Sequence, residues 1–573
     1  MRSKLRTAVA AAVLCLSLAA PAAAAEPVDP QFKAEIDGLL KNLDAATDGV
    51  VHWDGADRID LHRDGDASVA DFVNARLSIG PHKGNKAEDR LRLVLDRIEV
   101  RRSPAPDGGT AFDVIFPHTA TLRTAEGGES VLTLDKAGGR AVVDAKSSRI
   151  RETALDIAKA SLADQKTGDR IALGPLSLSS KLVAEPGGGW QAPITASVDR
   201  IDFYFTEGPV SGTIAHIGYT GQSAGPSLAG WYRLRDQIDA LHAKPPPEQR
   251  SAIGELLPQL LAQFSLAKGE VTVGATKVHN ASGENFVAFD KASLGGALSG
   301  LSGKTASWRL KLAGDGLLVS PDMLDPARVP HHLVLEFGME DLATAPLRTI
   351  IAAAIKARED AGGAGGQLAT MQLLGAAAAL NPVLRVYNLA FDTRDVGITG
   401  TAETKGSPVG PNGFKAKGEV SVRGFAALGG LVGPHSGLAA YLPLLEQLGV
   451  PETGPGGGPV LAFHLASAPP QWLSINGNDV SAWFTPDAHP AGGPRPLRPA
   501  DPPMKGAEVD AVQHALAAAG IKAPQNGRYD AATAAAVARF QKINRLNVDG
   551  VVDTATRQKL GLQPRPQPKK QGG

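Results

Sequence analysis

Two stretches near the C-terminal end, Asn526–Thr533 (NGRYDAAT) and Asp549–Thr556 (DGVVDTAT), follow one pattern. Each begins with an Asn-Gly or Asp-Gly pair, which supplies the positive φ that a tight turn needs. The Asp that follows is a natural helix N-cap, and the Thr three residues later lies where a capping side chain reaches back. The pattern therefore predicts, twice, a turn that leads directly into a helix.

Apolar residues at helical spacing surround these two turns. They predict a compact all-α bundle of three helices over residues 505–562, which is a marginal but sufficient length for a domain of its own. Its expected core consists of Val509, Val512, Leu516, Ile521, Val537, Phe540, Leu546, Val548 and Leu560.

Three segments of fixed spacing carry a resemblance to a known family: Val509–Gly520, Gly527–Gln541 and Leu546–Leu560. The module resembles the peptidoglycan-binding domain of bacterial wall enzymes, the PGBD-like three-helix fold. The resemblance covers about a tenth of the chain. It implies non-catalytic docking on peptidoglycan, with most motif residues serving as scaffold.

Four polar or amphipathic residues near the two turns are candidates for contact with that ligand: Arg528, Tyr529, Arg539 and Asp549. The alternative is that they are solvated surface residues without a special role, as most exposed polar residues are.

The first 25 residues are typical of a secretory signal peptide. Arg2, Lys4 and Arg6 form a positive region, an apolar run follows, and a small-residue cleavage site ends at Ala25. The chain's single cysteine, Cys15, lies inside the apolar run, so the mature protein is expected to contain no thiol. We expect an exported protein without a transmembrane segment in the mature chain.

Residues 486–504 are rich in Pro and Gly, and predict an extended linker between the module and everything before it. Residues 563–573 form a second Pro-rich, basic segment, which we expect to be a disordered tail.

For the body, residues 26–485, the sequence pattern predicts an α+β fold that is rich in antiparallel β-sheet with inserted helices. This fold could form one or two subdomains. Polar and apolar residues alternate at 58–62, 91–100 and 196–205, as in a sheet with one solvated face. Helical spacing appears at 228–242, 249–266, 347–358, 367–380 and 438–448. Glycine pairs such as Gly138-Gly139 indicate turns between strands.

A short repeat recurs in the body: Asp57–Asp60, Asp96–Glu99 and Asp199–Asp202 share the pattern D-R-I-[D/E]. The simpler interpretation is three strands that carry charge on their outward faces. The alternative is a duplicated β-unit, as in elongated sheets that handle lipid.

The body shows no motif that identifies an enzyme, and H-E-x-x-H is absent. Gly221–Gly225 (GQSAG) matches the G-x-S-x-G nucleophile elbow, but the antiparallel pattern around it favours a Gly/Ser turn over catalysis by Ser223. The histidines, His331 and His332 among them, have no convincing third metal ligand. We therefore expect no catalytic residues, metal or cofactor.

Net charge is zero overall, but it is unevenly spread: +3 in residues 1–25, −10 in 26–489 and +7 in 490–573. A basic C-terminal part suits an anionic wall surface, and the predicted export excludes a nucleic-acid role. The sequence predicts a wall-associated protein of the periplasm of a Gram-negative-type bacterium. Its module docks on peptidoglycan and its body binds or scaffolds.

Two alternatives for the body stay open at this stage. One is a peptidoglycan-remodelling hydrolase with an unrecognised site, and the other is a lipid-binding β-sheet protein tethered to the wall. Lipid and envelope proteins are accordingly further candidate partners.

Overall fold

The computed structural model describes residues 30–46, 51–80, 91–106, 108–123, 128–145, 147, 149–208, 210–241, 256–359, 375–376, 379–380, 382–406, 414–432, 441–454, 457–468, 471–480, 497–498 and 503–562. The predicted signal peptide, the tail and most of the predicted linker lie outside these residues. The chain divides into two compact units. Unit 1 comprises residues 1–324 and 344–374, and unit 2 comprises residues 325–343 and 375–573.

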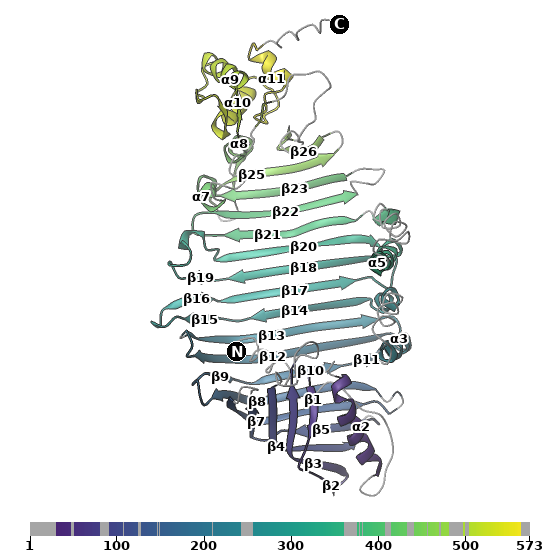
Figure 1. The fold of residues 1–573 in the computed structure, drawn as a ribbon. Coiled ribbons are helices and arrows are strands. Elements are labelled where there is room, and N and C mark those ends of the chain that lie inside the picture. Colours follow the sequence, from purple (N-terminus) through teal and green to yellow (C-terminus); the bar gives the residue numbers. More distant parts are fainter. Residues whose placement is uncertain are drawn as a thin grey trace, which may run out of the picture. The chain divides into compact units, whose positions relative to one another are not determined.

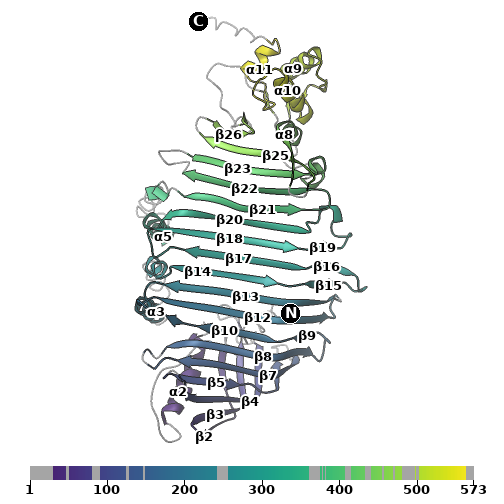
Figure 2. The same ribbon diagram turned by 180° about the vertical axis from the view of Figure 1, so that it is seen from behind.

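Unit 1 is built on antiparallel β-sheet, as its alternating segments predict. Its strands are β1 (Val51–Gly55), β2 (Arg58–Asp64), β3 (Ala67–Ile79), β4 (Leu91–Pro104), β5 (Thr110–Ile115), β6 (Thr119–Arg123), β7 (Glu129–Val143), β8 (Ile150–Asp164), β9 (Arg170–Leu173), β10 (Leu176–Lys181), β11 (Val183–Ala184), β12 (Trp190–Phe205), β13 (Val210–Gly225), β14 (Leu266–Val273), β15 (Thr276–His279), β16 (Asn285–Phe289), β17 (Lys291–Ser299), β18 (Thr305–Asp315) and β19 (Leu318–Val319). Long strands lie side by side in both views of the ribbon, and most neighbours are close in sequence (Figure 1, Figure 2).

The helices α2 (Pro30–Ala46), α3 (Leu228–Leu241) and α5 (Thr344–Glu359), and a short helical segment at 256–262, accompany this sheet. Phe32 and Ile36 of α2 are buried in a core with Phe72 and Leu93 of the first strands. None of the described helices is long and apolar enough to cross a membrane.

An aromatic cluster packs α3 against the end of the sheet. Trp190 at the start of β12 is 2% exposed, and its ring centroid lies 5.4 Å from that of Trp231 on α3 and 5.8 Å from that of Phe264. Such contacts bury much apolar surface at defined geometry. The helix predicted at 228–242 is thereby confirmed and its position explained.

The D-R-I repeat lies at an interruption in the long strands. Asn74 in β3, Lys136 in β7 and Arg200 in β12 have φ of +52°, +46° and +64°, a conformation that costs an L-residue roughly 1–2 kcal/mol. Apolar residues follow a period of two on each side but are three apart across the interruption, as Val198 and Ile201 show.

All three copies of the repeat stand at such interruptions. Asp57 accepts a hydrogen bond from Asn74 Nδ2 at 2.8 Å, Arg97 of the second copy pairs in register with Val73 next to Asn74, and Arg200 belongs to the third copy. The prediction of charged outward faces is confirmed, because Arg58, Arg97 and Arg200, one from each copy, are 69%, 60% and 70% exposed.

Unit 2 continues the antiparallel pattern and ends in the helical module. Its elements are the 3₁₀ helix η2 (Pro326–Arg328), β20 (His332–Ala343), β21 (Val383–Asp392), β22 (Gly397–Gly406), β23 (Phe414–Arg423), the 3₁₀ helix η3 (Phe425–Ala427), α7 (Leu428–Val432), α8 (Leu442–Leu448), β24 (Val450–Thr453), β25 (Pro459–Ala468), β26 (Gln471–Ile475), β27 (Asn478–Asp479), β28 (Met504–Lys505), α9 (Ala507–Ala518), β29 (Arg528–Tyr529), α10 (Ala531–Ile543) and α11 (Thr554–Lys559). Leu497, inside the predicted linker, is buried and forms a β-bridge with Val552.

Three local predictions need correction. Gly138-Gly139 is not a turn but the middle of β7, where both glycines pair with strands on either side. Gly221–Gly225 is neither a turn nor a nucleophile elbow, because Ser223 lies within β13 opposite Ala192 and Ala267. The helix predicted over 249–266 is helical in its described part only at 256–262, and β14 begins at Leu266.

Replacing Trp190 with Ala should release α3 from the sheet. Removing a buried indole lowers the free energy of unfolding by about 3–5 kcal/mol, because it leaves a cavity between Trp231 and Phe264 that the neighbours fill only in part. Hydrogen exchange of the amides of α3 is expected to accelerate strongly, whereas Val183→Ala, at a side chain that is 39% exposed, should leave it unchanged. Unchanged protection of α3 in Trp190→Ala would contradict the role given to the cluster.

Candidate functional site

The first turn of the module is built around the buried amide of Gln513 on α9. Its Nε2 donates to Asn526 Oδ1, to the carbonyl oxygen of Arg528 and to Thr533 Oγ1, each at 2.9 Å. Its Oε1 accepts from the backbone N–H groups of Asn526 and Gly527 at 3.1 and 3.0 Å. One side chain thus bonds four polar groups of the turn Asn526–Arg528 and the hydroxyl of Thr533 on α10, which fixes the turn's shape.

Gln541 on α10 repeats this arrangement at the second turn. Its Nε2 donates to Asp549 Oδ1, to the carbonyl oxygen of Val551 and to Thr556 Oγ1 at 2.8, 2.9 and 3.1 Å. Its Oε1 accepts from the N–H groups of Asp549 and Gly550 at 3.1 and 2.8 Å. The two sequence copies are therefore two copies of one hydrogen-bonded unit.

The glycine turns, the Asp N-caps and the core predicted for the two copies are confirmed. Gly527 and Gly550 both have φ of +64°. Asp530 and Asp553 are N-caps whose carboxylates accept from the N–H groups of Thr533 and Thr556 at 2.9 and 2.7 Å. The predicted core is buried or half-buried throughout.

The two turns differ in their surroundings. Gly550 lies against Leu444 of α8, since a Cβ added there would come within 2.3 Å of Leu444 Cδ2. Asn547 and Asp479 exchange two hydrogen bonds, of 2.7 and 2.6 Å. The second turn is thus a packing surface against α8 and β27, and one apolar cluster runs from Val422 and Phe463 into the module.

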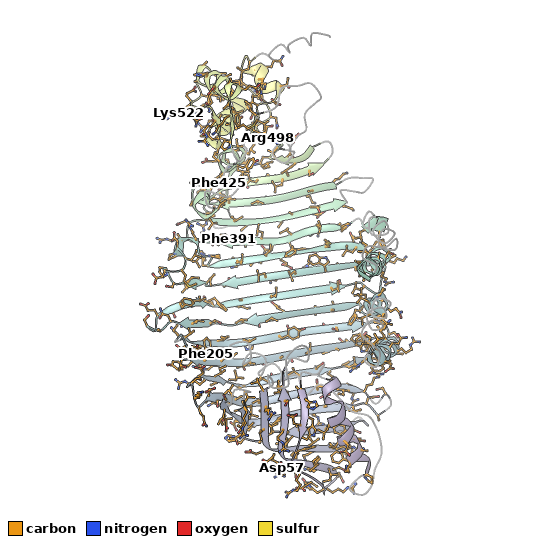
Figure 3. The ribbon with its side chains drawn as sticks, in the orientation of Figure 1. Asp57, Phe205, Phe391, Phe425, Arg498 and Lys522 are labelled. Carbon is orange, nitrogen blue, oxygen red and sulfur yellow. The ribbon has the colours of Figure 1, made fainter. Side chains whose placement is uncertain are left out.

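The first turn stays open to solvent by comparison. Asn526 and Arg528 are exposed, and Arg539 on α10 is exposed as well. Lys522 adds another exposed positive charge to this module (Figure 3). The open turn therefore presents the Arg528 side chain to a ligand, while the N–H groups of Asn526 and Gly527 are already bonded to Gln513 Oε1.

The four candidate contact residues fall into two pairs. Arg528 and Arg539 are exposed, whereas Tyr529 is 0% and Asp549 5% exposed. The Tyr529 hydroxyl donates to the carbonyl oxygen of Gly550 at 2.8 Å and so links the two turns. Burial raises the pKa of Tyr529 well above its usual value, which keeps this donor protonated.

The acids of the two copies titrate differently. Burial raises the pKa of Asp549 to about 7, although hydrogen bonds from the Val551 N–H and from Gln541 oppose the shift. Burial also acts on Asp530, but hydrogen bonds from Asn526 and Thr533 outweigh it and lower the pKa of that carboxyl. The position of Asp549 is occupied by the neutral Asn526 in the first copy.

The sequence did not reveal Gln513 and Gln541 as organising residues, although both belong to the matching motif. Their partners lie 8 to 20 residues away in the chain. One pattern in the sequence could have indicated their role: in both copies a Gln precedes an Asn-Gly or Asp-Gly pair, which is followed by Asp-x-x-Thr.

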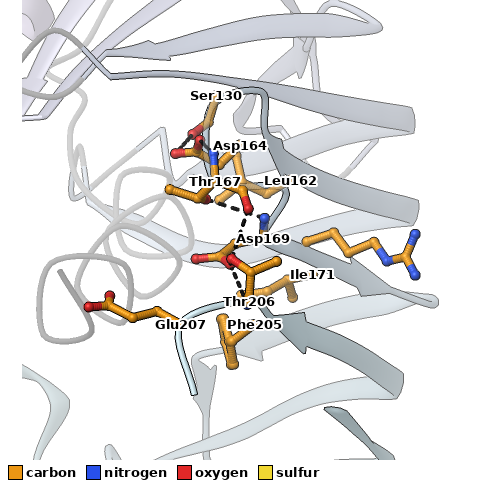
Figure 4. Close-up of a pocket in the computed structure, with 10 residues that line it drawn as sticks. Ser130, Leu162, Asp164, Thr167, Asp169, Ile171, Phe205, Thr206 and Glu207 are labelled. Carbon is orange, nitrogen blue, oxygen red and sulfur yellow. Dashed lines mark hydrogen bonds between the residues drawn. The ribbon is translucent and has the colours of Figure 1, made fainter. Parts of the chain in front are cut away.

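A second concave site lies in unit 1, between the ends of β8, β9 and β12 (Figure 4). It has a volume of about 350 Å³, and Leu162, Ile171 and Phe205 contribute to its lining. Asp164 accepts from the N–H groups of Lys166 and Thr167, both at 2.9 Å, and Asp169 accepts from the N–H of Thr206 at 2.8 Å. Both carboxylates therefore serve to fix the loops around the cavity.

The described part of the chain offers no cluster of side chains for a metal ion. No three His, Cys, Asp or Glu side chains gather there in a way that could hold a metal ion. His331 pairs with Asp392 at 3.1 Å, and Ser223 lies inside a strand.

Comparison with protein families identifies the module. Residues 505–560 match the family model described as "Putative peptidoglycan binding domain". A search of curated proteins and a search of solved structures each gave no match for the chain. The predicted resemblance of the C-terminal module is thus confirmed, and the body has no family match.

Replacing Gln513 with Glu should unfold the first turn. A carboxylate cannot donate to the three acceptors that now face Gln513 Nε2, and each lost partner in a buried site costs about 1–3 kcal/mol. Protection from hydrogen exchange should fall across Asn526–Thr533, whereas Gln558→Glu at an exposed position should preserve it. Equal protection in the two variants would refute the organising role of Gln513.

Stability of the second turn should decrease with rising pH. The pKa of Asp549 is higher in the folded state than the usual 3.8, so its protonation favours folding below about pH 4, and this contribution is lost as the pH rises through about 7. The total effect is at most about 4 kcal/mol.

Protection factors of the amides at 541–556, measured from pH 4 to 8, report this loss directly. Asp549→Asn, which copies Asn526 of the first turn, should flatten the profile. A wild-type profile that is already flat would contradict the raised pKa.

Proposed function

We propose that this chain, whose residues 505–560 form a domain of the peptidoglycan-binding type, is an exported protein that docks on peptidoglycan in the periplasm. The observation that carries the proposal is the family match together with the two glutamine-held turns, one of which is open. The body then has a non-catalytic binding or scaffolding role. The arrangement of the first 25 residues supports export, and a Gram-negative-type envelope is the setting we propose.

The open first turn is the surface we assign to the ligand. Peptide stems of peptidoglycan carry carboxylates. Arg528 in this turn, and Arg539 further along α10, offer exposed guanidinium groups that can each bind a carboxylate through two parallel hydrogen bonds. The second turn is occupied by α8 and β27 within unit 2, so it offers no comparable approach.

Tyr529 and Asp549 support this surface from within. Tyr529 links the first turn to Gly550 through a hydrogen bond. Asp549 accepts a hydrogen bond from Gln541 and so helps to hold the second turn. We therefore assign ligand contact to Arg528 and Arg539, and a positioning role to Tyr529 and Asp549.

The proposal predicts that the purified mature chain co-sediments with insoluble peptidoglycan sacculi. The double variant Arg528→Glu/Arg539→Glu should bind at least about a hundredfold more weakly, since each of the two lost charge-assisted hydrogen bonds is worth about 1.5–3 kcal/mol. Arg545→Glu/Lys559→Glu, which changes the module's net charge equally at other exposed positions, is the matched control.

Three outcomes would contradict parts of this account. Absence of wild-type chain from the pellet would refute docking, and equal loss in both double variants would leave only unspecific charge attraction. Release of soluble muropeptides by the wild-type chain would overturn the non-catalytic role of the body.

A further inference from the structure

One face of the sheet in unit 1 carries an apolar row that crosses it from strand to strand. Residues paired in register along this row are Leu61, Ala70, Val100, Val114, Gly139, Leu155, Leu178, Ala196, Tyr219, Val271, Leu294 and Leu312. None of these twelve positions is charged, although charged residues are common on the same strands. A row of this length requires that each strand keep its register.

Exposure changes along the row. At its beginning, Ala70 is fully buried in the core that contains Phe32 and Ile36 of α2. At its other end, Tyr219, Val271, Leu294 and Leu312 are 36%, 40%, 51% and 41% exposed. The same apolar surface that the chain covers with α2 at one end is thus solvent-accessible on β13, β14, β17 and β18.

The opposite face of the same four strands is polar. There, Thr220, Glu270, Gly295 and Lys311 form the adjacent row in register. The exposed apolar end is therefore specific to one face, and an exposed apolar patch of a few hundred Å² is often functional.

The exposed end suits an acyl chain better than a protein. Its backbone groups are paired with neighbouring strands, and its side chains demand no hydrogen bond except at the tip of Tyr219. A large apolar side chain has about 150–250 Å² of surface, so four that are roughly 40% exposed offer on the order of 300 Å². A stable protein interface needs about 800 Å² per partner.

The dimensions agree with this assignment. Four strands about 4.8 Å apart make a row of roughly 14 Å. An extended chain advances about 1.2 Å per bond, so the row matches an acyl segment of about a dozen bonds.

The width of the apolar strip favours a lipid with two chains. Beside the row, and on the same face, Gly221, Gly269 and Gly296 pair in register. Beyond them lies a third row, in which Ser223, Ala267, Leu298 and Trp308 pair, so that it is apolar on β14, β17 and β18. On β13 and β14 the Tyr219 side chain lies over Gly221 and Gly269. On β17 and β18 the strip spans two apolar rows with Gly296 and Leu310 between them, which is more width than one alkyl chain covers.

We propose that this apolar face, at Tyr219, Val271, Leu294 and Leu312, binds the acyl chains of a phospholipid. The head group stays in solvent, where it needs no partner from the uncharged row. This binding is independent of peptidoglycan docking, which involves residues of unit 2 only.

The test incubates the full mature chain with vesicles of phosphatidylethanolamine and phosphatidylglycerol, re-isolates the protein and measures bound phospholipid by mass spectrometry. Wild type should retain phospholipid, and Leu294→Gln/Leu312→Gln should retain at least fivefold less. Glu270→Gln/Lys311→Gln, on the opposite face of the same strands, is the matched control and should retain the wild-type amount.

Other results would overturn the proposal. Absence of phospholipid from the wild-type chain refutes it, and so does equal retention by the two double variants. A lipid-free dimer that Leu294→Gln/Leu312→Gln dissociates would assign the face to a second copy of the chain instead. Retention of a free fatty acid offered in parallel, without phospholipid, would exclude the two-chain lipid.

Discussion

Continuous antiparallel pairing is the constraint on which the body depends. Because side chains alternate across a strand, a sheet that keeps its register separates its residues onto two faces, and an error of one residue would exchange them. Unit 1 keeps an uncharged row in register from Leu61 to Leu312, while Glu270 and Lys311 stay on the other face. At residues of positive φ, such as Arg200, the spacing of apolar residues changes from two to three, which keeps them on one face of the sheet.

In the module, the corresponding constraint is the pair of buried amides, Gln513 and Gln541. Each bonds four polar groups of a turn, and a Thr hydroxyl of the helix that follows, which would otherwise lose their hydrogen bonds to water on folding. The duplication produces two turns with the same hydrogen bonds, but the two differ in what packs against them. One turn packs against α8 and β27, which ties the module to the end of unit 2, and the other presents Arg528 to solvent.

Local signals in the sequence predicted local structure well. The N-caps Asp530 and Asp553, the glycine turns and the apolar core of the bundle all follow from rules that operate within a few residues. Long-range properties were beyond those rules. The burial of Tyr529 depends on Gly550 of the other copy, and Gly138-Gly139 occurs within a strand because two neighbouring strands supply its hydrogen bonds. The exposed row on β13 to β18 is likewise a product of register, which alternation within one strand does not reveal.

The central claim is that the first turn of the module contacts peptidoglycan. Hydrogen exchange of the full mature chain, measured with and without soluble peptidoglycan fragments, tests it most directly. The account predicts slower exchange at Asn526–Asp530 and no change at Asp549–Val552, which is already covered within unit 2. Saturating fragments that leave Asn526–Asp530 unchanged, or that protect only residues of the body, would contradict it.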